Sequence, residues 1–195
     1  MYENVLSPIA IGGVEVPNRV VRTAHATGFA AGEMNDRLIA YHEARAKGGV
    51  GLTIVEIMGV HPSSPGSLLA FHPSIVEGHK RLMERLHPYG MRIFQQIWHA
   101  GHGSVPIEGG APWSPSDVPS VIDGRVPRPM SKMQIDEVVG SYAHATSVCK
   151  QAGLNGIEVH AAHGYLVQQF LSSNSNKRQD DYGGSLGNRM RFLLE

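Results

Sequence analysis

The chain has 195 residues, of which 42% are hydrophobic, and its 17 Lys and Arg residues balance its 17 Asp and Glu residues. This hydrophobic content excludes a disordered chain. The zero net charge argues against a protein that coats nucleic acid or an anionic membrane. No apolar run approaches the roughly 20 residues of a membrane span. Cys149, the single cysteine, excludes an intrachain disulfide framework and a cysteine-ligated iron–sulfur cluster, and the first eight residues lack the regions of an export signal, so we expect a cytoplasmic protein.

Four strands are predicted along the chain, after an N-terminal hairpin that turns at Gly12-Gly13. They are the β-favouring run 20–24 and the apolar runs 52–58, 92–98 and 156–160. A nearly continuous apolar run is typical of a parallel strand that is covered on both faces.

Helices separate these strands. They are predicted over residues 35–47, 75–87, 131–153 and 188–195, the last of which runs to the end of the chain. Asn35 or Asp36 caps the first helix, and Ser131 forms a capping box with Gln134 at the start of the third. The loop 99–129 is long and rich in Gly and Pro, and such loops in compact domains are more often functional than short ones.

The alternation of strands and helices predicts βαβ units and a parallel sheet, an α/β fold. No G-x-G-x-x-G motif opens the first helix, which disfavours a dinucleotide-binding doubly wound sheet. A (β/α)8 barrel fits better, but such barrels need about 250 residues. We therefore expect residues 1–195 to be the N-terminal half of one barrel domain, with about four β/α units and an N-terminal hairpin.

Polar residues lie near the carboxyl ends of these strands, which in a barrel form the active face. Strand 92–98 carries Gln96, and strand 156–160 ends in His160, which His163 and Tyr165 follow. Two imidazoles and a phenol are donors that suit a carbonyl oxygen or a flavin edge, and a tyrosine phenol stays protonated at neutral pH and can deliver a proton. The amide of Gln96 offers the donor and acceptor that a flavin pyrimidine ring requires.

Structural roles remain open for the same residues. The two histidines are equally compatible with a pair of structural imidazoles, and no H-E-x-x-H pattern supports a metal site. Gln95 and Gln96 suit internal hydrogen bonding, and Glu56 is expected to pair with Arg22, since an unpaired buried carboxylate is costly. Cys149 is expected in the core, and Trp98 and Trp113 suit either packing or ligand stacking.

Ordered motifs run through nearly the whole chain. They are residues 6–13 (LSPIAIGG), 17–21 (PNRVV), 45–52 (RAKGGVGL), 96–101 (QIWHAG), 152–165 (AGLNGIEVHAAHGY), 169–172 (QFLS), 176–186 (NKRQDDYGGSL) and 188–192 (NRMRF). On these motifs the sequence resembles the Old Yellow Enzyme family of FMN-dependent oxidoreductases, whose (β/α)8 barrel is about twice this length.

The resemblance implies an FMN cofactor with NADH or NADPH as electron donor. The implied flavin contacts are Thr23, Ala24, His25, Ala26, Ile57, Gln96 and His160. NAD(P)H would reduce FMN, which would pass a hydride to the β-carbon of an α,β-unsaturated carbonyl compound. In this scheme His160 and His163 bind the carbonyl oxygen, and Tyr165 protonates the α-carbon.

Departures from the family pattern leave the substrate open. Ala26 stands where many relatives have Cys or Thr, His25 beside it is found in some amine-dehydrogenase relatives, and Ile57 replaces a small residue. The alternatives are therefore an oxidative N-demethylase or amine dehydrogenase on the same scaffold, or a fragment that is inactive until a C-terminal half or a second copy complements it. The expected partner in each case is a small-molecule substrate, with no nucleic acid, membrane or metal.

Overall fold

The computed structural model describes residues 2–195. The helices are α1 (Glu3–Leu6), α2 (Asp36–Lys47), α3 (Ile75–Leu86), α4 (Lys132–Gln151), α5 (Leu166–Leu171) and α6 (Leu186–Leu194), with short 3-10 turns η1 (His87–Tyr89) and η2 (Gly101–Gly103). The strands are β1 (Ile9–Ile11), β2 (Val14–Val16), β3 (Val21–Arg22), β4 (Leu52–Gly59), β5 (Leu68–Leu69), β6 (Arg92–Trp98), β7 (Trp113–Ser114), β8 (Arg128–Pro129) and β9 (Gly156–Val159). The chain divides into a first compact unit (Met1–Met58, Ser67–Ile97 and Ala145–Glu158) and a second (Gly59–Gly66, Trp98–His144 and Val159–Glu195).

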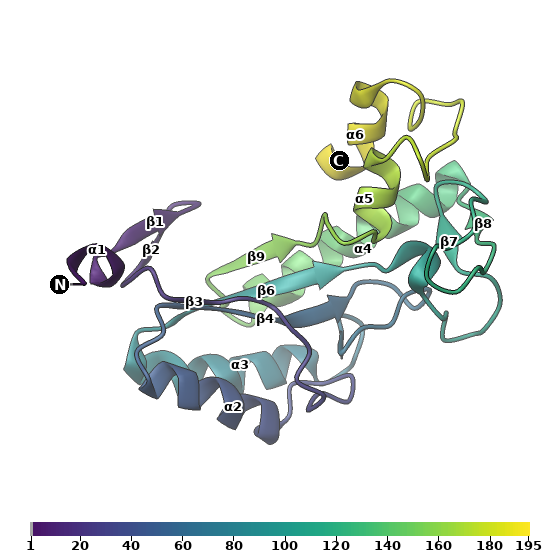
Figure 1. Cartoon of the computed structure of the whole chain (residues 1–195). Helices are drawn as coiled ribbons and strands as arrows, with labels where there is room; N and C mark the ends of the chain where they lie inside the picture. Colours follow the sequence, from purple (N-terminus) through teal and green to yellow (C-terminus); the bar gives the residue numbers. More distant parts are fainter. Residues whose placement is uncertain (1) are drawn as a thin grey trace. The chain divides into compact units, whose positions relative to one another are not determined.

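The largest sheet lies mainly in the first unit. Its strands follow the order β3-β4-β6-β9, and β5 pairs with β4 off this path. β3 and β4 are parallel, with Val21 opposite Leu52, and the arrows of β4 and β6 point the same way in Figure 1. Because α2 and α3 occur between successive strands of this sheet, the βαβ pattern and the α/β class predicted from the sequence are confirmed.

Several predicted bounds need correction. The first strand was expected over residues 20–24, but β3 ends at Arg22, and the His25 imidazole lies 3.1 Å from the Thr23 carbonyl. The fourth strand ends at Val159, so His160 follows the sheet. The last helix begins at Leu186, because Ser185 Oγ accepts a hydrogen bond from Asn188 N and caps it. The pattern also missed α1, β5 and α5, all of six residues or fewer.

Side chains alternate between the two faces of β4 and β6. On one face, Thr53 Oγ1 lies 3.2 Å from His42 Nδ1 of α2, and Gln95 Oε1 lies 2.9 Å from His79 Nε2 of α3. These helices run along the same side of the two strands in Figure 1. The opposite face is apolar where it meets the N-terminal hairpin, through Val16, Leu52, Ile54 and Phe94 with Ile9, Ile11, Val14 and Ala24 packed against them.

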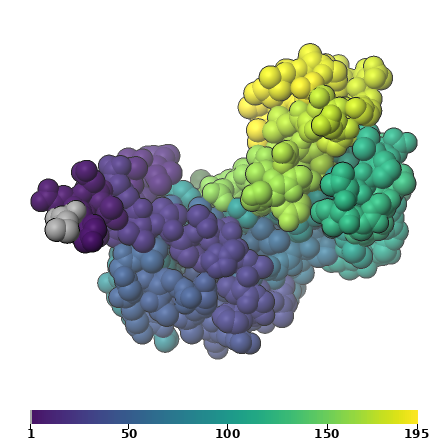
Figure 2. All heavy atoms as spheres, in the orientation of Figure 1, coloured from purple at the N-terminus to yellow at the C-terminus, as the bar shows by residue number. Residues whose placement is uncertain are grey.

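The second unit has its own core, between α4, α5 and α6. Buried residues Met130, Ile135, Val138, Leu166, Val167, Phe170, Tyr182 and Phe192 form it. Phe170 and Phe192 stack with their ring centroids 4.3 Å apart, which brings α5 against α6, and Figure 2 shows their yellow-green and yellow atoms as one continuous surface. The predicted capping box is confirmed, since Gln134 N donates to Ser131 Oγ and Ser131 N donates to Gln134 Oε1. Among the helices of residues 2–195, none has the length and apolarity of a membrane span.

Two buried side chains lie in the core of the first unit, and one of them affects how stability depends on pH. Cys149 is buried, as predicted for a core residue. His42 is completely buried, and desolvation lowers its pKa to about 3, aided by the nearby positive charges of Arg22 and Arg45. Since the unfolded chain binds a proton at this side chain below its ordinary pKa of about 6.5, stability is expected to fall as the pH drops from 6.5 towards 3.

Replacing His42 by leucine is therefore expected to flatten the pH dependence of stability. Between pH 7 and pH 5, the variant's free energy of unfolding should fall by about 2 kcal/mol less than that of the unchanged protein, at about 1.4 kcal/mol per pH unit below 6.5. Urea titrations at both pH values measure this difference. The matched control is His144→Leu, because His144 is exposed and its removal should leave the difference as it was. Parallel curves for His42→Leu and the unchanged protein would contradict the expectation.

Candidate active site

The predicted site residues fall into two groups, one in each compact unit. The first unit holds Thr23, Ala24, His25, Ala26, Ile57 and Gln96, and the second holds His160, His163 and Tyr165. In the first unit these residues follow β3 or lie on the carboxyl halves of β4 and β6. In the second they follow β9, where the chain turns into α5.

The segment after β3 is held by two charged side chains that do not pair with each other. Arg22 donates from Nη1 to the Ile54 carbonyl at 2.9 Å and from Nη2 to the His25 carbonyl at 3.1 Å. Glu56 is fully buried, and its Oε2 accepts the Thr27 backbone N–H at 2.9 Å. The predicted Arg22–Glu56 pair is therefore wrong within residues 2–195, because backbone groups of the 22–27 segment and β4 take both side chains.

This arrangement leaves the segment's own side chains outward. Thr23, His25 and Ala26 are exposed, and Ala24 is half-buried. Arg22 holds the His25 carbonyl inside this segment, and Glu56 holds the Thr27 N–H that follows it, so the segment has a defined course without a long strand. A backbone that is tied down in this way suits contact with a flat ligand.

Gln96 is positioned by its neighbour in the sheet. It lies on the same face of β6 as Phe94, two residues before it, and its Nε2 donates to Glu158 Oε1 of β9 at 2.6 Å. This bond fixes the orientation of the amide, since the nitrogen must face the carboxylate. Among the described residues no bond reaches Gln96 Oε1, so the carbonyl oxygen is left as a free acceptor. The sequence analysis missed Glu158, because only the pairing of β6 with β9 places it beside Gln96.

Unlike Gln96, neither Gln95 nor Ile57 has a polar side-chain group that is free to bind a ligand. Gln95 is buried and donates from Nε2 to the Glu56 carbonyl at 2.7 Å while its Oε1 meets His79, so its internal hydrogen bonding is confirmed. Ile57 is half-buried within β4. By strand alternation its side chain points to the face opposite Glu56. Any contact of Ile57 with a ligand beside Glu56 and Gln96 would thus use its backbone.

In the second unit, His160 and His163 are hydrogen-bonded in series. Ala162 N donates to His160 Nδ1 at 3.3 Å, so we assign the His160 proton to Nε2. His160 Nε2 lies 3.2 Å from His163 Nδ1, which makes Nδ1 the acceptor and leaves Nε2–H of the exposed His163 as a donor. His163 has a φ of 57°, a left-handed conformation that is uncommon outside glycine and clusters at functional sites.

Tyr165 lies directly against this pair. Its ring meets the His160 ring edge-to-face at 4.8 Å and the Trp98 ring at 5.2 Å. Trp98 is buried, whereas Tyr165 is half-buried, so packing holds the phenol from two sides. Among the described residues the Tyr165 hydroxyl has no hydrogen-bond partner, which leaves it available to a ligand. The structure thus brings His160, His163 and Tyr165 together, as predicted.

Gln169 supports this turn, and the sequence analysis did not single it out. Its Nε2 donates to the Gly164 carbonyl at 2.6 Å and to the Ala100 carbonyl at 3.1 Å. Its Oε1 accepts from His102 N and Ser114 Oγ. A single buried amide therefore joins the 160–165 turn to the loop after β6 and to β7. The described residues contain no group of three or more His, Cys, Asp or Glu side chains arranged to hold a metal ion.

Known proteins match this chain over nearly its whole length. Residues 4–195 match the NADH:flavin oxidoreductase / NADH oxidase family. An NADH oxidase of Thermoanaerobacter brockii is 41% identical over 202 residues, which cover 100% of this chain and 31% of that protein. An NADPH dehydrogenase of Bacillus velezensis is 37% identical over 202 residues, which cover 100% of this chain and 59% of that protein.

Solved structures agree with these matches. A 2-naphthoyl-CoA reductase complex superposes with a TM-score of 0.93 at 34% identity, over 100% of this chain and 32% of that one. Morphinone reductase in complex with tetrahydroNAD gives a TM-score of 0.89 at 29% identity, over 98% of this chain and 58% of that one. This chain thus spans about a third of some relatives and nearly three-fifths of others.

Proposed function

We propose, starting from the fact that this chain belongs to the NADH:flavin oxidoreductase / NADH oxidase family, that it forms part of an FMN-dependent NAD(P)H oxidoreductase. The resemblance to Old Yellow Enzyme relatives predicted from the motifs is confirmed by this match and by the similar structures. The proposed reaction is reduction of the activated C=C bond of an α,β-unsaturated carbonyl compound, in the cytoplasm.

The proposed extent is the first four β/α units of a (β/α)8 barrel. The β3-β4-β6-β9 order supports it, as does the partial coverage of the matched relatives. A barrel needs eight strands to close. The remaining units would come from chain outside these 195 residues, from a complementing half or from a second copy.

The residues of the first unit fit FMN. A flavin pyrimidine ring carries an imide N–H beside carbonyl oxygens, and the unengaged Gln96 Oε1, held outward by Glu158, supplies the acceptor that this N–H needs. The backbone of Thr23–Ala26, anchored by Arg22 and Glu56, supplies a surface for the ring, and Ile57 completes the contacts proposed in this unit. FMN when bound supplies the hydride transfer, and the protein supplies orientation and electrostatics.

The histidines and Tyr165 would act on the substrate. The Nε2–H group of His163 donates to the carbonyl oxygen, which stabilises negative charge as it develops there, and His160 orients that imidazole by donating from its own Nε2 to His163 Nδ1; one donor to the oxygen is typically worth a few kcal/mol of barrier. The Tyr165 hydroxyl delivers a proton to the α-carbon. The observation that carries this proposal is the contact of the Tyr165 ring with His160, together with the His160–His163 bond.

One relative supports a second candidate function. An N,N-dimethylglycine/sarcosine dehydrogenase of Chromohalobacter salexigens is 36% identical over 207 residues, so oxidation of an N-methyl amine on the same scaffold stays open. The two reactions run in opposite directions with respect to the flavin. Ene reduction consumes NAD(P)H, whereas amine oxidation reduces the flavin without it.

An absorbance experiment on the full-length protein tests FMN binding and distinguishes the two candidate reactions. We expect a yellow FMN complex that oxidises NAD(P)H with cyclohexenone and is not reduced by N-methyl amines. Gln96→Leu should weaken FMN binding roughly tenfold, the order expected for a lost buried hydrogen bond. Gln151→Leu, on the exposed end of α4, is the control and should bind as before. A colourless protein that takes up no FMN would rule the proposal out, and flavin bleaching by the amine would favour the second candidate.

A further inference from the structure

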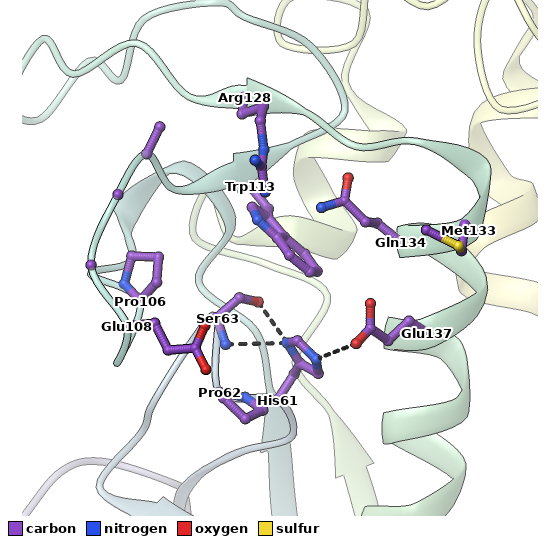
Figure 3. A pocket seen from close by; sticks show the side chains of 13 residues that line it. His61, Pro62, Ser63, Pro106, Glu108, Trp113, Arg128, Met133, Gln134 and Glu137 are labelled. Atoms are coloured by element: carbon purple, nitrogen blue, oxygen red, sulfur yellow. Dashed lines mark hydrogen bonds and ion pairs between the residues drawn. The ribbon is translucent and has the colours of Figure 1, made fainter.

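A cavity of about 470 Å³ lies in the second unit, outside the residues proposed for catalysis. It is bordered by the turn after β4, the loop before β7, the strand β8 and the first turns of α4 (Figure 3). Trp113, Pro62 and Pro106 contribute apolar wall, and Arg128, Glu108 and Glu137 contribute charge. Its volume is within the range of small-molecule sites.

The charged residues around this cavity have opposite signs but do not pair with one another. Among the ion pairs of residues 2–195, neither Arg128 nor Glu108 takes part, and Glu137 meets only His61, at 3.2 Å. The cavity therefore presents a cation and carboxylates that do not neutralise one another. A ligand with one cationic and one anionic group would pair with both kinds of charge in the cavity.

Trp113 lies between the two kinds of charge. The Arg128 guanidinium carbon is 5.9 Å from the centroid of the Trp113 ring, and the His61 ring is 5.2 Å from Trp113 at an angle of 32°. His61 in turn meets Glu137. Figure 3 shows this order, from Arg128 through Trp113 and His61 to Glu137. The indole therefore forms an apolar wall between the cationic and anionic ends of the cavity.

A directed hydrogen-bond chain holds the anionic end in place. Ser63 N donates to His61 Nδ1 at 3.1 Å, which leaves the His61 proton on Nε2, facing Glu137 Oε1. Behind it, Ser63 Oγ lies 2.8 Å from both His61 Nδ1 and His99 Nε2, and Gly101 N donates to His99 Nδ1. His99 is buried, and burial lowers its pKa to about 3, so it stays neutral. The bond from His61 occupies Glu137 Oε1, and among residues 2–195 no hydrogen bond reaches its Oε2, which is available to a ligand.

We propose that this cavity binds a small linear zwitterion, an ω-amino acid, with its ammonium group at Glu137, its methylene chain along Trp113 and its carboxylate at Arg128. Glu108 adds a second carboxylate for the ammonium group of the ligand. A guanidinium suits a carboxylate because it donates two parallel hydrogen bonds. The site is independent of the proposed reaction, because none of its residues belongs to the flavin or substrate groups.

Calorimetry on the full-length protein without substrate tests this inference. The probe is 6-aminohexanoate, compared with hexylamine, hexanoate and the shorter 3-aminopropanoate. We expect 6-aminohexanoate to bind at least about tenfold more tightly than each of the others, since each lacks one charge-assisted contact or the span between them. Binding should also change the fluorescence of Trp113, and Trp113→Phe should abolish that change.

Variants at each end make the test specific. Arg128→Gln and Glu137→Gln should each weaken 6-aminohexanoate roughly tenfold and should leave it no better than hexylamine or hexanoate, respectively. The controls Arg37→Gln and Glu84→Gln, both exposed in the first unit, should bind like the unchanged protein. Equal affinity for all four probes, no detectable binding, or unchanged affinity in the cavity variants would overturn the proposal. Because no turnover is measured, none of these outcomes depends on the FMN proposal.

Discussion

Replacing Tyr165 by phenylalanine is expected to slow alkene reduction by the full-length enzyme about a hundredfold or more, the range in which positioned proton donors act. The aromatic ring keeps its edge contacts with Trp98 and His160, so the fold of the turn should persist. Only the hydroxyl is lost, and with it the proton for the α-carbon. Stopped-flow absorbance at the flavin band, with NAD(P)H first and cyclohexenone second, measures the two half-reactions separately.

The split between these half-reactions identifies the role of Tyr165. Reduction of the flavin by NAD(P)H should proceed at the original rate, because that step needs no proton from the phenol. The control is Tyr89→Phe, which removes a phenol of the first unit that donates to Glu43 and lies outside both groups of site residues. An unchanged oxidative half-reaction in Tyr165→Phe would rule out proton donation, and equal slowing of both halves would indicate a structural role.

The long elements were predictable because local sequence determines them. Asn35 caps α2 by accepting from Leu38 N at 3.0 Å, and the Ser131–Gln134 box begins α4, so both helix starts follow from pairs of residues three positions apart. The apolar runs became β4 and β6 for a similar reason, since buried strands need continuous apolar sequence. By contrast, α5 spans six residues and begins with Leu166 N donating to the His99 carbonyl, a contact between residues far apart in the sequence.

The site residues divide in the same way. His160, His163 and Tyr165 are neighbours in sequence, and a turn brought them together as predicted. Glu56 was assigned to the wrong partner because the competing Thr27 N–H is a backbone group that no composition pattern marks. The Gln96–Glu158 pair and the His61–Ser63–His99 chain depend on strand neighbours and on loops 36 or more residues apart. Hydrogen bonds of this kind appear only once the topology is known.

Gly101→Ala is expected to lower the free energy of unfolding by about 4 kcal/mol. Gly101 has a φ of 64°, which costs an L-residue roughly 1 kcal/mol or more. A Cβ there would lie 2.1 Å from Gln169 Oε1, inside the buried amide that bonds Ala100, Gly164, His102 and Ser114. The amide must move, and each buried group left without its partner costs about 1–3 kcal/mol.

Gly103→Ala is the matched control for this change, in the same 3-10 turn. A Cβ at Gly103 meets no atom within 4 Å, and its φ is not positive, so a change of roughly 0.5 kcal/mol or less is expected. Urea unfolding of both variants, followed by tryptophan fluorescence, compares them directly. Because Gln169 also holds the Gly164 carbonyl, Gly101→Ala should disturb the turn that carries His163 and Tyr165 even in molecules that remain folded. Similar unfolding midpoints for the two variants would show that the amide of Gln169 does not organise this part of the chain.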